Sequence, residues 1–485
     1  MDDRQSLPRG RNALGLCLVA AGLALAPACT KDFEAVNTNP NEPTEVPAGL
    51  LLRQVIFDYA DAMSYEGFTG GANLGQYFSA RSGFNAFDRG DLLAPQFGSN
   101  PWPALYPNLR DVTLVLDASR EDPTQAVYEG PALVLRAVVA GSLTDIFGDV
   151  PYREAGRGRA GEVDPVYDPQ EEIYLGSEGL LASLAIAVAA MDAYTGPATL
   201  EGDVLYGGDL AAWTRLANTL RLRFALRASD AAGGVAREVI ADVLADGRFI
   251  TEGSDDAVFR FGSAPNDFRF ARARLGDFTN YLMSTTIDST LDALDDPRER
   301  LWFRAADDGS YSGVRNGQPV GSSLDGVPVS LPGRVWREEA GALKFPFATA
   351  WETHFVLAEA AARGLAGGDA EALYGEGVRL AFEYWGVDLP ADYLARPGVA
   401  YAGVEQIATQ RWLASIGMGY QGWTVWRRTG APAFFAPLAS LNGGLIPVRF
   451  PYPADEQALN APNYEAALGR IGGENSPNAP VWWDR

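Results

Sequence analysis

The stretch TDIFGDVPYREA, residues 144–155, follows a run of small apolar residues at 132–143. The length and spacing of that run predict a buried helix. Gly148 can adopt the left-handed conformation that ends a helix, and Pro151 prevents the helix from resuming. The stretch therefore predicts a helix that ends at Gly148.

Composition and charge limit the class of protein. The 485 residues are 47% hydrophobic, which is enough to bury a large core, and the length alone suggests two to four domains. The 62 acidic and 39 basic residues give a net charge of -23, which repels phosphate backbones and argues against nucleic acid as a partner. An acidic excess of this size is more typical of a solubility device than of a binding site.

The N-terminus has the pattern of an export signal. Arginines at positions 4, 9 and 11 precede an apolar stretch at 13–26, which is shorter than the roughly 20 residues of a membrane-spanning helix. The stretch ends in LAPAC, which resembles the lipobox of bacterial lipoproteins. We therefore predict a lipoprotein signal peptide over residues 1–28 and a lipid anchor at Cys29. Cys17 would leave with the signal, and a structural free thiol at Cys29 is the alternative.

Beyond Cys29 the chain divides into a short tether and a long helical region. Proline and asparagine residues predict an extended, lipidated tether over residues 29–47, and residues 48–485 are expected to form one domain. The apolar spacing predicts helices at 47–60, 105–116, 128–143, 171–193, 210–228, 235–245, 282–293, 353–364, 370–384 and 404–416. Long loops, with room for short hairpins, are expected at 247–274 and 307–337, where glycine, proline and charge interrupt the spacing.

The helix predicted at 210–228 has the most regular pattern. Its apolar stripe, which should face the core, consists of Trp213, Leu216, Leu220 and Phe224. The arginines between them, Arg215, Arg223 and Arg227, are expected to bridge acidic neighbours rather than to bind a ligand.

The residues that enzymes most often use are scarce. His354 is the only histidine, and its apolar neighbours predict a place in the core rather than in catalysis. A zinc site would have to consist mostly of carboxylates. The acidic pairs in the sequence, which solvation or turn capping would explain, are Asp145 with Asp149, Asp255 with Asp256, and Glu338 with Glu339. We expect no catalytic residue, no metal and no cofactor.

Aromatic residues in loop-like surroundings are the remaining candidates for a site. They are Tyr77, Phe84, Phe87, Trp102 and Tyr106, which lie among glycine, serine, asparagine and proline. Rings in polar loops can stack on the apolar faces of sugars while nearby polar groups bind the hydroxyls. The alternative is that these rings anchor the loops to the core.

Several phrases, in order along the chain, resemble the SusD/RagB-like outer-membrane lipoproteins, in particular the SusD-like branch. TDIFGDVPYREA is similar to the family phrase T-D-x-x-G-D-[IV]-P-[YF]. The other phrases are NTNPNEPT after the lipobox, W-x-x-x-Y at 102–106, W-x-x-x-A-N-x-L-x-L-R from Trp213, FVLAEAAARG from Phe355, and WLASIGMGYQGWTVWRRTG followed by IPVRFPYP. Together they cover almost the whole mature chain.

The resemblance implies a mainly α fold, in which tetratricopeptide-like helix pairs support an irregular, loop-rich ligand-binding face. The break at 148–151 would be a structural signature of that fold, where the chain turns from a scaffold helix into a surface loop. The implied function is capture of oligosaccharides or similar oligomers at the outer membrane and their delivery to a SusC-like TonB-dependent transporter. Two alternatives remain: a lipid-anchored, glycan-cleaving enzyme with a carboxylate pair, and a helical-repeat adaptor that binds only protein.

Overall fold

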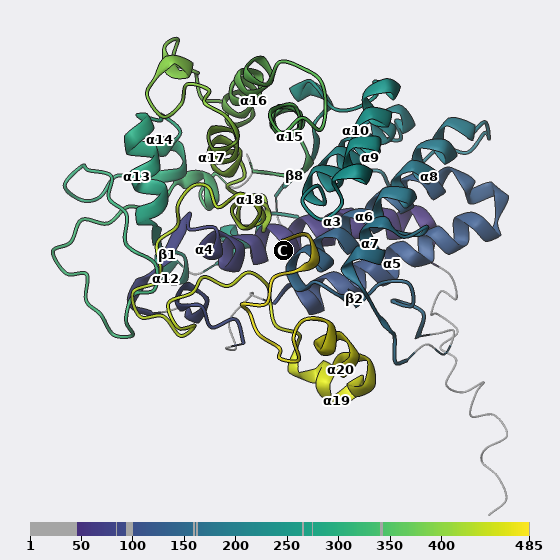
Figure 1. The fold of residues 1–485 in the computed structure, drawn as a ribbon, viewed down its shortest axis with the longest axis horizontal. Coiled ribbons are helices and arrows are strands. Elements are labelled where there is room, and N and C mark those ends of the chain that lie inside the picture. The colour runs from purple at the N-terminus through teal and green to yellow at the C-terminus, as the bar shows by residue number, and fades with distance from the viewer. Residues whose placement is uncertain are drawn as a thin grey trace, which may run out of the picture. The chain divides into compact units, whose positions relative to one another are not determined.

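Helices that follow one another in the chain pack side by side and form most of the molecule (Figure 1). The computed structural model describes residues 46–83, 85–93, 100–158, 161, 163–263, 266–273, 275–339 and 343–484. The longer helices are α3 (Ala48–Glu66), α5 (Pro101–Glu121), α6 (Glu129–Phe147), α7 (Gln170–Leu175), α8 (Leu180–Ala193), α9 (Leu210–Arg227), α10 (Gly233–Asp246), α13 (Thr285–Leu294), α15 (Ala350–Ala362), α16 (Ala370–Trp385), α17 (Val404–Ala414), α18 (Gln421–Thr429), α19 (Ala454–Leu459) and α20 (Ala461–Arg470).

The pairs form two groups within the compact unit Ala48–Arg485. In the first, α5 packs against α3 and α6, α8 against α6 and α9, and α9 against α10. In the second, α15 packs against α16 and α17, and α17 against α18. Helix α9, which also packs against α6 in the first group, contacts α15 in the second and so joins the two groups. This architecture confirms the predicted mainly α fold.

Short helices and turns fill the less regular part of the molecule, around α13 and β1 in Figure 1. The short α-helices are α4 (Ala72–Leu74), α11 (Arg269–Arg272), α12 (Leu275–Phe278) and α14 (Glu299–Trp302). The π-helical turn η1 (Gly67–Gly71) continues α3. The 3₁₀ turns are η2 (Arg81–Gly83), η3 (Ala86–Arg89), η4 (Pro123–Tyr128), η6 (Gly253–Asp255), η7 (Arg334–Trp336), η9 (Tyr393–Ala395) and η10 (Trp482–Asp484).

The described strands form antiparallel pairs. These are β1 (Phe78–Ala80) with β5 (Tyr281–Met283), β2 (Val150–Pro151) with β3 (Tyr167–Asp168), β4 (Ala257–Arg260) with β8 (Lys344–Ala348), and β6 (Phe303–Arg304) with β7 (Leu331–Pro332). Strands β4 and β7 lie in the two regions predicted as long loops. Because β4 pairs with β8 and β7 with β6, both regions are held by distant strands rather than by local hairpins.

Most predicted helices are confirmed, and two need correction. The helix predicted at 171–193 is broken into α7 and α8, since the chain bends between Gly176 and Gly179. The helix predicted at 282–293 begins only at Thr285, because the Ser284 side chain accepts a hydrogen bond from Thr286 N and residues 281–283 pair in β5. The sequence analysis missed α18, α19 and α20.

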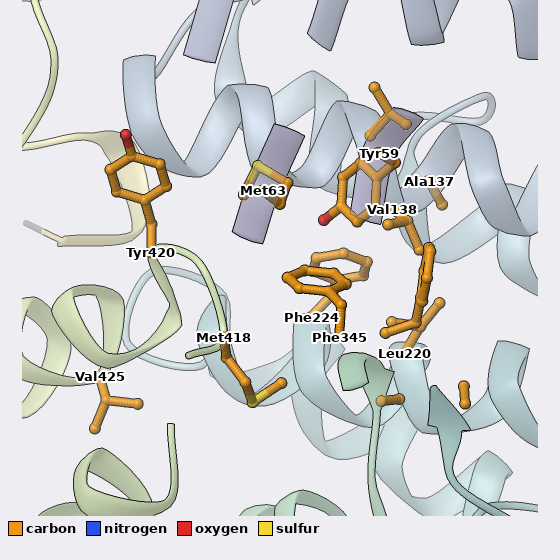
Figure 2. Close-up of a cluster of buried hydrophobic side chains, with 14 of the residues drawn as sticks. Tyr59, Met63, Ala137, Val138, Leu220, Phe224, Phe345, Met418, Tyr420 and Val425 are labelled. Atoms are coloured by element: carbon orange, nitrogen blue, oxygen red, sulfur yellow. The ribbon is translucent and has the colours of Figure 1, made fainter. Parts of the chain in front are cut away.

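The main hydrophobic core lies between α3, α6, α9 and β8. Figure 2 shows Tyr59 from α3, Phe224 from α9 and Phe345 from β8 close together. The ring centroids of Tyr59 and Phe345 are 5.8 Å apart, in an edge-to-face arrangement that aromatic rings favour. The predicted apolar stripe of α9 is confirmed, since all four of its members are buried. The arginines of α9 pair with Asp255, Glu352 and Asp145, as predicted.

The end of α6 is closed by hydrogen bonds from distant parts of the chain. Thr144 O accepts bonds from Gly148 N (2.8 Å) and from the Gln170 side chain (2.7 Å). The next three carbonyls, of residues 145, 146 and 147, accept bonds from the Arg427 side chain (2.6 Å), from Phe450 N (2.8 Å) and from Arg449 Nε (3.2 Å), respectively. A helix end leaves four carbonyls without helical partners, and here all four are satisfied.

The side chains of the same stretch are buried rather than solvated. Asp145 binds Arg227 and Tyr174, and accepts a 3.0 Å hydrogen bond from Trp483 Nε1. Asp149 accepts a 2.8 Å bond from Gln170 N and also binds Arg470. The expectation that solvation or turn capping accounts for this acidic pair is therefore wrong for Asp145, because buried donors from three distant segments hold its carboxylate.

Two further expectations about this stretch are corrected. Gly148 has a φ of 86° but a ψ of -123°, so its backbone is not in the left-handed helical region, although it is in a region that favours glycine. Val150, Pro151 and Tyr152 are buried, the first two in the β2–β3 pair. The exposed loop begins only after Tyr152. The signature stretch therefore links helices in the interior rather than leading straight to the surface.

Candidate ligand-binding site

The β4–β8 pair and the end of α16 bring Lys344 and Tyr384 together. Lys344 begins β8 and pairs with Arg260, and Tyr384 lies in the last turn of α16. The Tyr384 hydroxyl donates a 3.2 Å hydrogen bond to Lys344 O, and Lys344 Nζ lies 3.8 Å from the centroid of the Tyr384 ring. These two side chains separate two adjoining pockets, because both residues line both of them.

The first pocket is called the aromatic pocket because most of its lining side chains are aromatic. It is lined by Ser64, Phe68, Phe261, Phe268, Trp336, Leu343, Lys344, Tyr384, Trp385, Ile416 and Gly417. The Trp385 ring lies 5.7 Å from the Trp336 ring and 5.5 Å from the Tyr384 ring, both edge to face. Because Trp385 is only partly buried, it is the ring that a ligand in this pocket would meet most readily.

The second pocket, the polar pocket, carries the charged side chains of Asp256, Lys344 and Glu383. It is lined by Gly253, Asp256, Lys344, Ala350, Trp351, Leu380, Glu383 and Tyr384. Asp256 Oδ1 accepts a 2.7 Å hydrogen bond from Ala350 N, the first N–H of α15. Arg379 donates a 2.6 Å bond to Glu383 Oε2. Each carboxylate therefore has one oxygen engaged by the protein.

Several polar groups of this pocket have capacity for further hydrogen bonds. Within the described part of the chain, Trp351 Nε1 is buried without a partner, and no carboxylate lies within ion-pair distance of Lys344 Nζ. Burial raises the pKa of Asp256 to about 7, against the opposing effects of Ala350 N–H and Lys344. Burial also lowers the pKa of Lys344. Buried polar groups normally have partners, so unsatisfied groups around one pocket indicate a place for a polar ligand or water.

The two pockets together offer the contacts that a sugar ring requires. Aromatic rings can pack on its apolar face, and the adjoining carboxylates, ammonium and indole N–H can bind its hydroxyl groups. Hydroxyl groups both donate and accept, which suits a pocket that carries unused donors and acceptors side by side.

The aromatic residues singled out in the sequence lie elsewhere. Tyr77 stacks on Trp412 and is 2% exposed, Phe87 is 3% exposed, and Trp102 is 8% exposed. Tyr106 is partly buried and donates a 3.0 Å bond to Pro151 O, while Phe84 lies outside the described residues. The ligand-binding role of these five residues stays a prediction. In this structure Tyr77 and Phe87 anchor their loops, which was the alternative, and Trp102 is buried in the first turn of α5.

The other sequence candidates lie away from the pockets or are engaged in pairs. The His354 ring shares a 2.9 Å hydrogen bond with Ala350 O within α15. Glu338 and Glu339 form ion pairs with Arg304 and Arg334 at the surface. Among the described residues, no three His, Cys, Asp or Glu side chains come together as a metal site would require.

Sequence reasoning missed the residues that line the pockets. They come from α3, η1, η6, the chain on either side of β4, η7, β8, α15, α16 and the chain after α17, so no local pattern contains them. The one local signal was the cluster of aromatic residues at the end of α16, Tyr384 and Trp385, directly before a helix-ending glycine.

A helical scaffold that carries an aromatic pocket beside a polar pocket defines a class of ligand-binding proteins, and comparison with known proteins identifies the family. The SusD-like family, described as starch-binding and associating with the outer membrane, matches residues 40–453. The chain belongs to this SusD-like family, which confirms the resemblance inferred from its sequence.

Solved structures agree with this assignment. A chitin-binding protein is 26% identical, with a TM-score of 0.77, and the match covers 90% of this chain and all of the other. A chitin-binding SusD homologue from Flavobacterium johnsoniae is 23% identical, with a TM-score of 0.77 and coverage of 90% and 98%. A SusD homologue from Bacteroides fragilis is 23% identical, with a TM-score of 0.78 and coverage of 91% and 100%. No curated protein matches the chain.

Proposed function

We propose that this protein is a surface-exposed lipoprotein that captures oligosaccharides and holds them at the aromatic and polar pockets on either side of Lys344 and Tyr384. The observation that carries the proposal is that the two pockets adjoin at Lys344 and Tyr384. Stacking surfaces and unused hydrogen-bonding groups meet there, and they are complementary to the two faces of a sugar ring. Membership of a family described as starch-binding supports the same ligand class.

The first sugars to test follow from the family and from the similar structures. The family description names starch, and two of the similar structures are described as chitin-binding. An acetamido group would suit the site, since its methyl group can enter an aromatic pocket while its amide binds polar side chains. We therefore place oligosaccharides of N-acetylglucosamine first and those of glucose second.

The remaining parts of the proposal concern location and partner. The signal peptide at 1–28, the lipidated Cys29 and the tether at 29–47 would hold the domain 48–485 at the outer membrane. Residues 1–45 lie outside the described part of the chain. We propose that a SusC-like TonB-dependent transporter receives the captured oligosaccharide, in keeping with the family description as associating with the outer membrane.

The first test is calorimetric titration of the soluble chain from Thr30 onward with both sugar series and a panel of peptides. Trp385→Ala should weaken sugar binding by about tenfold or more, equivalent to about 1.4 kcal/mol, because it removes the most accessible ring of the aromatic pocket. The matched control is Phe435→Ala, which removes an exposed ring, 41% accessible, that lines neither pocket.

Three outcomes would count against the proposal. Equal losses for both variants would place the sugar elsewhere. Unchanged binding in Trp385→Ala but weaker binding in Trp102→Ala would favour the residues singled out in the sequence. Binding of peptides and of no sugar would favour the protein-only adaptor.

One observation favours the glycan-cleaving alternative enough to test it. Burial raises the pKa of Asp256 to about 7, and Asp256 shares the polar pocket with Glu383. Glycosidases pair a carboxylic acid of raised pKa with a second, ionised carboxylate. We expect no cleavage, because the family is one of carbohydrate-binding proteins. Chromatography of bound oligosaccharides after long incubation would reveal shortened products, and their loss in Glu383→Gln would establish an enzyme instead.

A further inference from the structure

The loop that follows α18 has an unusual surface. Between Arg428 and Arg449 the sequence contains no charged residue, although 21% of the chain is charged. An uncharged run at 137–144 lies in α6 and is buried. By contrast, residues 430–448, which we call the apolar loop, form neither helix nor strand and are yellow-green in Figure 1. The loop exposes four large apolar side chains, Phe435, Leu438, Leu441 and Leu445, which are 41%, 53%, 54% and 57% accessible.

The backbone of the apolar loop is fixed to the protein. Leu438 N donates a 3.0 Å hydrogen bond to Asn316 O, and Leu441 N donates a 2.7 Å bond to Arg89 O. The Asn316 side chain in turn donates to the buried carboxylate of Asp88. The leucines are therefore presented to solvent by a backbone whose own polar groups are turned toward the protein. A contiguous apolar surface of this kind marks a contact with a partner or a membrane.

The polar side chains of the apolar loop are engaged by the protein as well. Ser440 and Asn442 are the only ones in its sequence. Ser440 Oγ accepts hydrogen bonds from Asn442 N (3.0 Å) and Gly444 N (2.9 Å), and the side chains of Asn442 and Asn478 exchange two bonds, of 2.7 and 2.8 Å. A protein partner normally forms about one hydrogen bond for each 100–200 Å² of interface, whereas the hydrocarbon of a membrane needs none.

The distribution of charge also favours lipid. The net charge of -23 repels the phosphate groups of lipid headgroups, but the apolar loop has no carboxylate to do so. At its edge lies the exposed cation of Arg315, whose guanidinium carbon is 5.2 Å from the centroid of the Phe435 ring and which donates a 3.0 Å bond to Ala436 O. A cation beside exposed apolar side chains matches phosphate groups above hydrocarbon. The family is described as associating with the outer membrane.

We propose that the apolar loop is a lipid-contacting surface, which inserts Phe435, Leu438, Leu441 and Leu445 into the headgroup layer of a membrane. It would be a second contact beside the predicted anchor at Cys29. Because an anchor on an extended tether leaves the domain free to turn, the second contact would set which face of the domain meets the membrane. The inference rests on the proposed membrane location and not on sugar binding.

The first test is flotation of the soluble chain from Thr30 onward, which lacks the anchor, with vesicles of phosphatidylcholine. The chain should float with the vesicles. The double variant Leu438→Ser/Leu441→Ser should bind about tenfold more weakly, or weaker still, because two buried leucines are lost from the contact. The matched control is Leu459→Ser in α19, which removes a leucine that is 75% accessible and should leave binding unchanged.

A second measurement locates the contact. The chain from Thr30 onward has no cysteine, so Leu441→Cys provides a single site for an environment-sensitive dye. Its emission should shift to the blue when vesicles are added, and that of labelled Leu459→Cys should not. The absence of flotation, or equal responses of the two labelled sites, would overturn the proposal. Self-association in sedimentation that Leu441→Ser abolishes would assign the surface to a second copy of the chain instead.

Discussion

Gly148 has a backbone conformation that other residues can adopt only at a cost. Its φ of 86° with ψ of -123° lies outside the left-handed helical region that asparagine or aspartate can visit, and its ideal Cβ position is 3.5 Å from Val481. A methyl group would therefore fit here, but a residue with a Cβ atom cannot readily adopt these dihedral angles. Glycine is required at this position by the backbone conformation and not by lack of space.

Gly148→Ala should lower the free energy of unfolding by about 2 to 3 kcal/mol, as expected for a strained backbone position. The control is Gly247→Ala, at a φ of 75° and ψ of -1°, with no atom within 4 Å of its ideal Cβ, where the expected loss is about 1 kcal/mol. Denaturant unfolding of both variants checks the difference. Equal losses would show that the unusual ψ of Gly148 has no energetic consequence.

Asp145 provides a second test at the residue scale. Asp145→Asn leaves the buried guanidinium of Arg227 without its carboxylate and should cost about 3 to 5 kcal/mol. Asp192→Asn breaks an exposed pair with Arg248 and should cost less than about 1 kcal/mol. The same unfolding measurement compares them. A loss below 1 kcal/mol for Asp145→Asn would mean that the buried network around the signature stretch is dispensable.

Among the elements, the π-helical turn η1 makes a close backbone approach to the turn before α18. The ideal Cβ of Gly67 would lie 2.2 Å from the Cα of Gly419, in that turn, and that of Gly71 would lie 2.5 Å from Gly419 O. Only glycine allows η1 and this turn to cross at such a distance. The crossing brings α18 against η1 and α4, so it joins the N-terminal and C-terminal parts of the helical scaffold.

Gly67→Ala should therefore be strongly destabilising, by about 3 kcal/mol or more, because backbone atoms rather than a flexible side chain must move. Gly375→Ala is the matched control in a helix. Its nearest neighbour, Leu394 Cδ1, would be at 3.5 Å, and alanine should stabilise α16 by about 0.5 to 1 kcal/mol. In calorimetric melting we expect the melting temperature to fall in Gly67→Ala and to rise in Gly375→Ala. A mild effect of Gly67→Ala would contradict the close crossing.

The elements that the sequence predicted well are those with their own periodicity. The stripe of α9 is a local feature, and the structure places it as expected. The break between α7 and α8 was missed because the apolar spacing continues on both sides of Gly176. Helix α18 was missed because it has only nine residues and relies on buried contacts of Trp423 and Arg427 rather than on a repeated pattern.

For the molecule as a whole, the site was harder to predict than the fold. Tyr77 and Trp102 look like loop residues in the sequence, but segments distant in the chain cover them, as the stacking of Tyr77 on Trp412 shows. The residues around Lys344 and Tyr384 meet only after segments from α3 to the chain after α17 have folded together. Tertiary burial of a loop, and assembly of a pocket from distant segments, leave no mark on local composition.

The buried carboxyls set the pH dependence of the whole molecule. Burial raises the pKa of Glu66 to about 7, of Asp256 to about 7 and of Asp484 to about 6, from ordinary values of 4.5, 3.8 and 3.8. The folded state holds these protons more tightly than the unfolded state, so their effect is to lower stability as the pH rises from about 4 to about 7.

The arginine-paired carboxyls act in the opposite direction. Burial opposes the ionisation of Glu352 and Glu359, but the arginines around them outweigh it and lower the pKa of both. The stability that these pairs contribute is present above the unfolded pKa near 4.5 and is lost as the pH falls through the lower, folded value. The two groups of carboxyls together predict maximal stability at about pH 4 to 5, near the unfolded pKa values.

Melting temperatures measured from pH 4 to pH 9 at constant ionic strength should therefore pass through a maximum on the acidic side of neutrality. Asp256→Asn should melt higher than the wild type at pH 8, and the difference should shrink as the pH falls and vanish near pH 4, because asparagine keeps the acceptor for Ala350 N–H without the buried charge, at about 1.4 kcal/mol per unit of pKa shift. A steady rise of the wild-type melting temperature up to pH 8 would contradict this account.

The contact between Trp483 and Asp145 bears on how the chain is made. Trp483 Nε1 donates to the Asp145 carboxylate, and Trp483 N lies 3.4 Å from its acceptor, Gln170 Oε1, so the interior end of α6 is completed by a residue 338 positions after Asp145. Translation proceeds from the N-terminus, so α6 leaves the ribosome long before the segment that carries Trp483. The end of α6 therefore reaches its final packing only after that distant segment has been made.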